Sequence, residues 1–351
     1  MLKHPSASLC VPTPDGSGQA VHPDVLHVSD GFLGYPYWMA CTPYPFAQDR
    51  AENPLVRVSN DGVLWEPFPG APDPLVAAPT DASWHHADTD LVLHQGVLYL
   101  FYISTNRHEA ETTFSLITTR DGVHWTPPSV IYRDEWGVSP AAVVTESGQW
   151  QLWYVWRDSL SRAQTSRLYR RTSNDPCLLG PPQLCSLEIP GHVVWHLDVL
   201  NNTTSYEALV TAFPAGTDPS RSRLFHATSL DGIDFKLSTG QPLLKPSWFG
   251  WDNRMVYRST FVKRCDGTYR VWYSAASWGM RCGIGLLEGQ LSQLRPVHGA
   301  NANNQLPRLK LLREDALGLA KYVVYRILPA QIYSLVLSMR DRMRTMQSGQ
   351  P

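Results

Sequence analysis

Three of five repeated segments in this chain carry an aspartate at the same position. The segments begin near residues 22, 88, 139, 196 and 258, and each precedes a run rich in aromatic and aliphatic residues. Residues two apart on a strand share a face. Converging carboxylates can act as a general acid and a general base. The aligned pairs are His22 and Asp24, Asp88 and Asp90, Ser139 and Ala141, His196 and Asp198, and Arg258 and Thr260.

Charged groups that converge in a protein interior are costly unless they pair or take part in chemistry. We therefore expect a functional pocket where these side chains meet. The alternative is that the aspartates brace neighbouring repeats through hydrogen bonds. A divalent ion is a further alternative, since enough nitrogen and oxygen donors are present. We assign no metal ligand and expect no required cofactor, although a structural calcium ion is compatible with this donor set: His22, Asp24, His86, Asp88, His196 and Asp198.

The repeats themselves predict the fold. A period of roughly 50–65 residues with several short strands in each repeat indicates a propeller. We expect an all-β, five-bladed β-propeller followed by a C-terminal amphipathic α-helical tail. The expected parts are a lead-in with a strand that could close the ring (1–20), the propeller (21–295), a linker (296–307) and a basic tail (308–351).

Three repeats contain an Asp-Gly pair followed three residues later by Trp or Phe. Asp-Gly is a strong hairpin-turn signal because the turn requires positive φ. The pattern matches the Asp-box turns of sialidase-type propellers, which lie far from active sites. We therefore assign Asp61, Asp121 and Asp231 no catalytic role.

The tail differs from the rest of the chain in charge. Residues 306–351 carry eight Lys/Arg against three acids, which leaves the propeller mildly acidic and argues against nucleic-acid binding there. The apolar spacing predicts two helices broken at Pro329. They would pack back on the propeller, or dock through residues 308–346 on a partner protein or a membrane surface.

Targeting signals are not apparent in the chain. The N-terminus has no apolar core of signal-peptide length. No uninterrupted apolar stretch reaches membrane-spanning length. We expect a cytoplasmic protein. In one alternative it is associated with a membrane, and in another it is part of a particle assembled in the cytoplasm.

The residues also carry a family resemblance. The chain resembles the five-bladed propeller glycoside hydrolases, namely the arabinanase/β-xylosidase group with the invertase/levanase group as cousins. The resemblance covers about residues 20–290 and rests on the five repeats, on His22-Pro23-Asp24, and on His86-Ala87-Asp88 with Asp90 beyond it. It implies that Asp24 is the base or nucleophile, and that Asp90 or Asp88 tunes the pKa of its partner.

The chain departs from that family at the general acid. The family acid is usually a Glu beside Gly-Pro in a later blade, whereas blade 3 here has Ser139-Pro140-Ala141 without a carboxylate. Asp198 lies in register in blade 4 and is the first choice for the acid, with Glu135 second. Glycoside hydrolysis requires two carboxyls about 5–10 Å apart.

We therefore expect a glycan-active protein, with a glycoside hydrolase-like enzyme as the first hypothesis. The alternative is a non-catalytic sugar-binding or assembly propeller, on a bacterial surface or a phage-type particle, attached through its C-terminal helices. The aromatic residues near the pocket would stack on sugar rings, or they would pack in the core. The expected substrate-binding residues are His22, His86, Asp88, Ser139, Trp195, His196, Tyr257 and Arg258.

Overall fold

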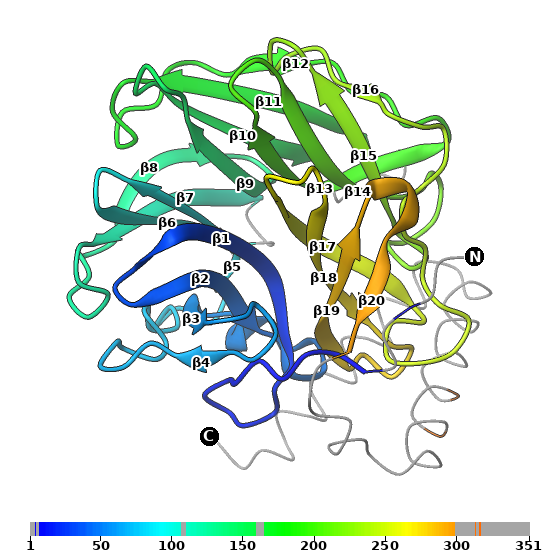
Figure 1. The fold of residues 1–351 in the computed structure, drawn as a ribbon, viewed down its shortest axis with the longest axis horizontal. Helices are drawn as coiled ribbons and strands as arrows, with labels where there is room; N and C mark the ends of the chain where they lie inside the picture. The colour runs from blue at the N-terminus through cyan, green and yellow to red at the C-terminus, as the bar shows by residue number, and fades with distance from the viewer. Residues whose placement is uncertain are drawn as a thin grey trace. The chain divides into compact units, whose positions relative to one another are not determined.

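The computed structural model describes residue 4, residues 7–106, 110–158 and 165–298, and residues 313 and 316. In this part of the chain, five four-stranded antiparallel sheets are each formed from consecutive strands. Figure 1 shows these sheets as blades arranged around a common centre. The expected fold, an all-β five-bladed propeller, is confirmed. The predicted helical tail lies outside the described residues, apart from Arg313 and Ala316.

The strands of each blade are numbered from the axis outward. Blade 1 contains β1 (Ala20–Phe32), β2 (Tyr35–Pro43), β3 (Leu55–Ser59) and β4 (Glu66–Pro67). Blade 2 contains β5 (Trp84–His94), β6 (Val97–Asn106), β7 (Glu111–Thr119) and β8 (Ser129–Asp134). Blade 3 contains β9 (Gly137–Val144), β10 (Trp150–Arg157), β11 (Ser166–Ser173) and β12 (Gln183–Cys185). Blade 4 contains β13 (His192–Asn201), β14 (Tyr206–Pro214), β15 (Arg223–Ser229) and β16 (Lys236–Leu237). Blade 5 contains β17 (Met255–Lys263), β18 (Tyr269–Ala276), β19 (Cys282–Gly289) and β20 (Arg295–Val297).

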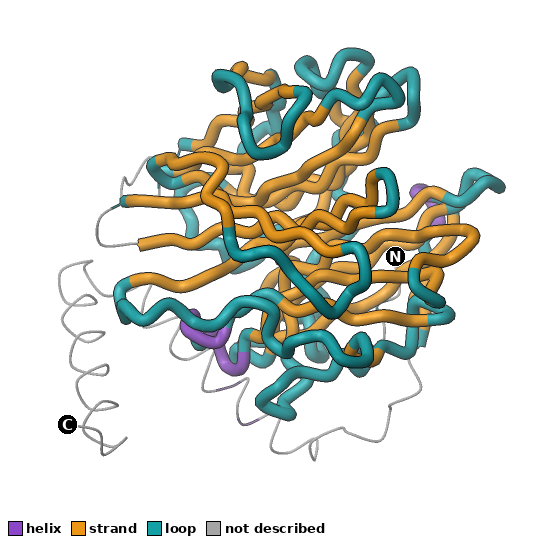
Figure 2. The backbone as a smooth tube through the Cα atoms, turned by 90° about the vertical axis from the view of Figure 1, so that its left-hand side faces the viewer, coloured by secondary structure: helices purple, strands orange, loops and turns teal. Residues whose placement is uncertain are grey.

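Helical structure is slight in the described residues. Figure 2 shows strands and loops along nearly the whole described backbone. The exceptions are three 3₁₀ turns, η1 (Pro45–Ala47), η2 (Asp49–Ala51) and η3 (Leu291–Gln293). No helix in the described part of the chain is long and apolar enough to cross a membrane.

The five first strands form a closed ring at the centre. Each contacts the first strand of the next blade, and β17 contacts β1. Large aromatic side chains on the second strands are fully buried between blades, at Trp38, Trp153 and Trp272. Packing of this kind fixes the distance between neighbouring blades, so the first strands hold their axial side chains in defined positions.

The Asp-Gly turns join one blade to the preceding blade. Asp61 accepts hydrogen bonds from Val63 N–H and Leu64 N–H at 2.8 Å each, which holds the turn. Gly62 has φ +71°, and an added Cβ would lie 3.0 Å from Trp272 of blade 5. Trp272 Nε1 donates to Gly62 O at 2.9 Å. The same contact recurs between Trp153 of blade 3 and Gly232 of blade 4 at 2.8 Å, so these turns serve as structural contacts between blades.

The N-terminal lead-in lies at the junction of blades 5 and 1. Residues 7–19 form no strand, and every blade is complete without them. Leu9 N–H donates to Ile284 O of β19 at 2.7 Å. Leu9 and Val11 are buried in one apolar cluster with residues of blades 1 and 5. The lead-in therefore contacts both ends of the ring mainly through apolar side chains, without exchanging a strand.

Candidate functional site

A β-bulge lies at the same level of each blade, near the start of the first strand. The pairing register shifts between Val21 and Asp24, and between Ala87 and Asp90, with similar shifts in the other three blades. His22, Asp88 and Ser139 have positive φ values of 53°, 45° and 58°. Such bulges redirect side chains and are common next to active sites. Here they turn two layers of polar side chains toward the axis.

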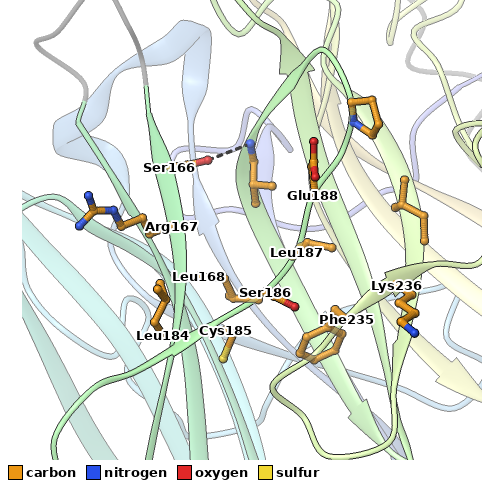
Figure 3. Close-up of a pocket in the computed structure, with 13 residues that line it drawn as sticks. Ser166, Arg167, Leu168, Leu184, Cys185, Ser186, Leu187, Glu188, Phe235 and Lys236 are labelled. Carbon is orange, nitrogen blue, oxygen red and sulfur yellow. Dashed lines mark hydrogen bonds between the residues drawn. The ribbon is translucent and has the colours of Figure 1, made fainter.

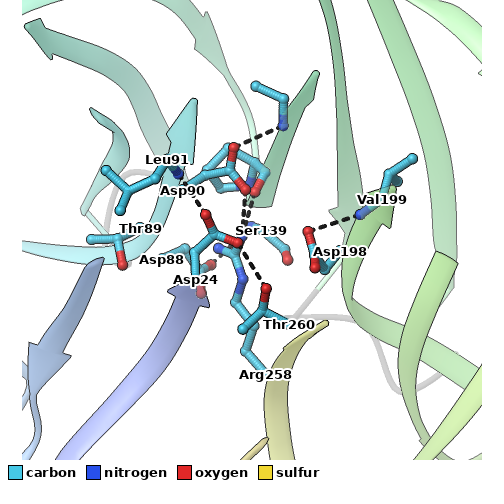
Figure 4. A network of polar contacts seen from close by, with 12 residues as sticks. Asp24, Asp88, Thr89, Asp90, Leu91, Ser139, Asp198, Val199, Arg258 and Thr260 are labelled. Carbon is cyan, nitrogen blue, oxygen red and sulfur yellow. Dashed lines mark hydrogen bonds and ion pairs between the residues drawn. The ribbon is translucent and has the colours of Figure 1, made fainter. Parts of the chain in front are cut away.

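The first layer is an aspartate ring, formed by Asp24, Asp90 and Asp198. Figure 4 shows these carboxylates with their hydrogen-bond partners. Each accepts a backbone N–H from the next blade: Asp24 from Leu91 at 2.7 Å, Asp90 from Ala142 at 2.8 Å, and Asp198 from Phe261 at 3.3 Å. The same hydrogen bond, from a backbone N–H of the next blade to an aspartate, therefore occurs three times around the axis. This is the alternative in which the aspartates brace neighbouring blades.

The remaining oxygens of the aspartate ring are also bonded. Thr260 Oγ1 donates to Asp24 at 3.1 Å, Arg258 Nη2 donates to Asp90 at 3.1 Å, and Val199 N–H donates to Asp198 at 2.9 Å. Burial, together with the charge of Asp198, raises the pKa of Asp24 to about 7. Burial and the charge of Asp24 raise the pKa of Asp90 well above its usual range. The carboxyl groups of the aspartate ring therefore tend to bind protons, so that the three of them do not all carry a negative charge at once.

The second layer is a histidine–aspartate cluster, formed by His22, Asp88 and His196. One oxygen, Asp88 Oδ1, lies 3.2 Å from His22 Nε2 and 3.4 Å from His196 Nδ1. All three residues are at most 2% exposed. These three atoms have no hydrogen-bond partner among the described residues, and neither does His196 Nε2. The cluster thus brings together buried polar atoms that the protein itself leaves unsatisfied.

The protonation states of this cluster suit a metal ion. Burial lowers the pKa of His22 to about 4 and that of His196 well below its usual range, so both rings are neutral. Burial would raise the pKa of Asp88, but the neighbouring His22, His196 and Arg258 lower it to about 2. Metal ligands must be deprotonated. Two ligands of a tetrahedral ion with bonds of about 2.1 Å are roughly 3.4 Å apart, which agrees with the separations of Asp88 Oδ1 from His22 Nε2 and from His196 Nδ1.

The cluster has a carboxylate and aromatic rings beside it. Glu52, from the loop between β2 and β3, is buried, and its Oε2 lies 3.5 Å from His22 Nδ1. The Tyr257 ring lies 4.7 Å from the His22 ring and 4.8 Å from the His196 ring. Trp195 packs at 4.6 Å from Tyr257. Tyr257 and Trp195 were predicted from the sequence as binding residues, whereas Glu52 was not.

Other predicted residues lie elsewhere or have structural partners. His86 is within hydrogen-bonding distance of Ser104 Oγ at 2.8 Å and of Ala77 O at 3.0 Å. Ser139 Oγ both accepts from Leu197 N–H and donates to Leu197 O at 3.0 Å. Glu135 is exposed on the loop after β8. Of the predicted set, the structure therefore brings His22, Asp88, His196 and Tyr257 together at the cluster.

A groove separate from the axis lies between the outer strands of blades 3 and 4. It encloses about 690 Å³ and is lined by residues of β11, β12, β13 and β16, by residues 186–188, and by Pro190 and Phe235. Figure 3 shows that apolar side chains such as Leu187 and Phe235 face it, with Arg167 and Lys236 among its lining residues. None of the predicted site residues lines this groove.

No protein-family model matches the chain. A curated relative, the A type blood N-acetyl-α-D-galactosamine deacetylase of Flavonifractor plautii, is 26% identical over 310 residues. The match covers 73% of this chain and 40% of the relative, so the chain spans less than half the length of that protein.

Solved structures share the propeller. A crystal structure of an N-acetylgalactosamine deacetylase from F. plautii, in complex with blood group B trisaccharide, has a TM-score of 0.75 and 23% identity, covering 82% of this chain and 95% of that one. A thermostable family-43 glycoside hydrolase has a TM-score of 0.59 and 14% identity, covering 85% and 99%. The chain has the five-bladed propeller fold of these proteins. The predicted resemblance to the five-bladed propeller glycoside hydrolases is thereby confirmed at the level of fold.

Proposed function

We propose that this protein is a carbohydrate deacetylase that hydrolyses the acetamide group of an N-acetylated sugar. The observation that carries the proposal is the histidine–aspartate cluster with Glu52 beside it, in a chain 26% identical to an N-acetylgalactosamine deacetylase. We infer that His22, Asp88 and His196 hold a divalent metal ion. Two imidazole nitrogens favour zinc, manganese, iron or cobalt over calcium, which takes oxygen ligands.

The reaction adds water across the amide C–N bond. The water oxygen bonds to the carbonyl carbon, the C–N bond breaks, and the products are acetate and an amino sugar. A metal ion bound here would supply polarisation of the carbonyl group and a lowered pKa for the attacking water. Glu52 is the carboxylate we assign as general base, because it is buried beside the cluster without being one of the three converging donors. It takes the proton from water and delivers it to the leaving nitrogen.

The surrounding side chains position the substrate. Tyr257 and Trp195 pack against the two histidine rings and form an apolar wall beside the cluster. Such a wall suits the methyl group of an acetamide and excludes water from the reacting bond. In this proposal the aspartate ring takes no part in the chemistry and braces the blades.

The second candidate is the glycoside hydrolase predicted from the sequence. The observation in its favour is the aspartate ring, where a pKa of about 7 at Asp24 would keep an acid protonated near neutral pH. Both oxygens of each of these aspartates accept hydrogen bonds from the protein. The carboxylates are therefore engaged in bracing the blades, whereas glycoside hydrolysis needs two carboxyls that contact water and sugar.

One substrate distinguishes the two functions. p-Nitrophenyl N-acetyl-α-D-galactosaminide carries both bonds, so acetate reports deacetylation and p-nitrophenol reports glycoside cleavage. Acetate is expected, without p-nitrophenol. Dialysis against a chelator should abolish acetate release, and zinc, manganese or cobalt should restore it, with calcium as the control. p-Nitrophenol release that survives chelation would instead support the glycosidase. Neither product, over a panel of N-acetylated sugars, would favour a non-catalytic propeller.

A further inference from the structure

The loop between β2 and β3 connects the candidate active site to the rim of the propeller. At one end it carries Glu52, beside the cluster. At the other end it carries Phe46, whose side chain is 47% exposed. η2 contacts β5 of blade 2, and η1 contacts β19 of blade 5. The six steps along the chain from Phe46 to Glu52 span between about 12 Å if helical and about 20 Å if extended.

The backbone at Phe46 is held in an unfavourable conformation. Phe46 has φ 50° and ψ 39°, and Ala47 has φ 62°. Two consecutive left-handed residues, neither of them glycine, asparagine or aspartate, cost free energy. Such outliers persist where surrounding contacts enforce them, and they cluster at functional sites. The conformation places a large apolar ring where it is half open to solvent.

The surrounding contacts enforce this conformation. Gln19 Oε1 accepts from Phe46 N–H at 3.2 Å and from Cys282 N–H at 3.1 Å, which ties the loop to blade 5. Tyr44 N–H donates to Gln19 O at 2.7 Å. The Arg281 guanidinium lies 5.8 Å from the centre of the Phe46 ring. The ring and the cation are thus presented together on a fixed loop.

We propose that Phe46 and Arg281 form a sugar-binding subsite for an oligosaccharide substrate. A sugar ring further along the glycan packs against the exposed part of Phe46, and its hydroxyl groups accept hydrogen bonds from Arg281. An aromatic face with a few fixed donors is the usual composition of a small-ligand site. This inference rests on the proposed deacetylase function and adds that the preferred substrate is a glycan chain.

The test compares two probes that carry the same acetamide group. One is methyl N-acetyl-α-D-galactosaminide, and the other is a trisaccharide with this sugar at its non-reducing end. Acetate release by the unaltered protein should favour the trisaccharide by about tenfold in kcat/KM, the effect of one good aromatic contact. Phe46→Gly and Phe46→Asn should remove this preference, with the monosaccharide rate unchanged within about twofold.

These two substitutions preserve the loop, because Gly and Asn tolerate positive φ. Phe46→Trp should keep the preference, and Arg281→Met should reduce it. Phe249→Ala is the matched control, since Phe249 is an aromatic residue 85% exposed on a different loop. An equal loss on both probes would overturn the inference, since the loop would then act only by placing Glu52. No preference in the unaltered protein would also overturn it.

Failure of the proposed function gives a separate result. If the unaltered protein releases no acetate from either probe, trisaccharide binding is measured by saturation-transfer NMR. Contacts that disappear in Phe46→Gly support the subsite without the enzyme. Absence of trisaccharide binding overturns it, as would binding of anionic lipid vesicles that depends on Phe46.

Discussion

Two layers of polar side chains lie on the axis of this propeller, and they differ in what their polar atoms contact. In the aspartate ring, each carboxylate is bonded to the backbone of the next blade. In the histidine–aspartate cluster, four nitrogen and oxygen atoms are buried without a hydrogen-bond partner among the described residues. Buried polar groups are normally satisfied. The saturated layer accords with a structural role, and the unsaturated layer is the one where we propose that a ligand binds.

The largest expected effect is on catalysis and separates the two layers directly. Asp88→Asn should reduce acetate release by on the order of 10³-fold, because the ligand that provides the charge of the site is lost. Asp198→Asn should keep activity within about tenfold, since its carboxylate accepts the N–H groups of Phe261 and Val199 and belongs to the ring that braces the blades. Acetate release per folded molecule and bound metal per chain are the measurements. Equal losses in both variants would place the aspartate ring in the chemistry.

The second prediction concerns the junction of blades 5 and 1. At this junction the acceptor of the axial hydrogen bond is a neutral hydroxyl: Thr260 Oγ1 accepts Val25 N–H at 3.3 Å. This bond is weaker than the corresponding bonds to an aspartate carboxylate. The lead-in supplies apolar contacts at this junction through Leu9 and Val11. Deleting residues 1–20 should destabilise the propeller by about 3–6 kcal/mol, because the free energy gained by burying these two side chains is lost. Thermal unfolding measures this, and an unchanged Tm would show that the axial layer closes the ring alone.

A third prediction tests the bracing role of a single aspartate. Asp24→Ala leaves Leu91 N–H without its acceptor and removes the partner of Thr260. A buried donor left in this way costs about 1–3 kcal/mol. Denaturant unfolding should show this loss, while Asp30→Ala, which removes an exposed carboxylate from the same strand, serves as a surface control. An unchanged free energy of unfolding in Asp24→Ala would mean that the aspartate ring does not hold the blades together.

The sequence predicted the axial layers because both lie on repeats that can be aligned with one another. The alignment placed His22, Asp88 and His196 at axial positions, and the structure brings them together. Asp61, Asp121 and Asp231, to which the sequence assigned no catalytic role, accept backbone N–H groups within turns. The sequence did not predict that the aspartate ring and the histidine–aspartate cluster would differ in their contacts. This difference depends on the β-bulges, because a small shift of register changes the direction of a side chain. A sequence pattern of period two does not reveal such shifts.

Glu52 was missed for a different physical reason. It lies on the irregular loop between β2 and β3, and the described parts of the other blades have no matching pair of 3₁₀ turns, so no repeat places it near the axis. Its position depends on η1 and η2 and on the contacts that hold positive φ at Phe46 and Ala47. An acid shortly before a strand, followed directly by Asn53 and Pro54, is a weak signal in sequence.

The smallest effect concerns a buried carboxylate that contrasts with the aspartate ring in its pKa. Glu207 is buried, which would raise its pKa. Hydrogen bonds from His226 at 2.9 Å, Lys263 at 2.7 Å and Tyr269 at 2.7 Å, with one from Asn202, lower it strongly. A pKa lowered by folding adds stability above the unfolded pKa of about 4.3, and this stability is lost as the pH falls through the folded pKa.

Glu207→Gln should therefore lower the free energy of unfolding at pH 7, and the difference from the unaltered protein should shrink below about pH 4. Urea unfolding between pH 3 and pH 7 measures this. A pH-independent difference would mean that Glu207 acts through packing, and that cationic partners are not what separates it from the aspartates on the axis.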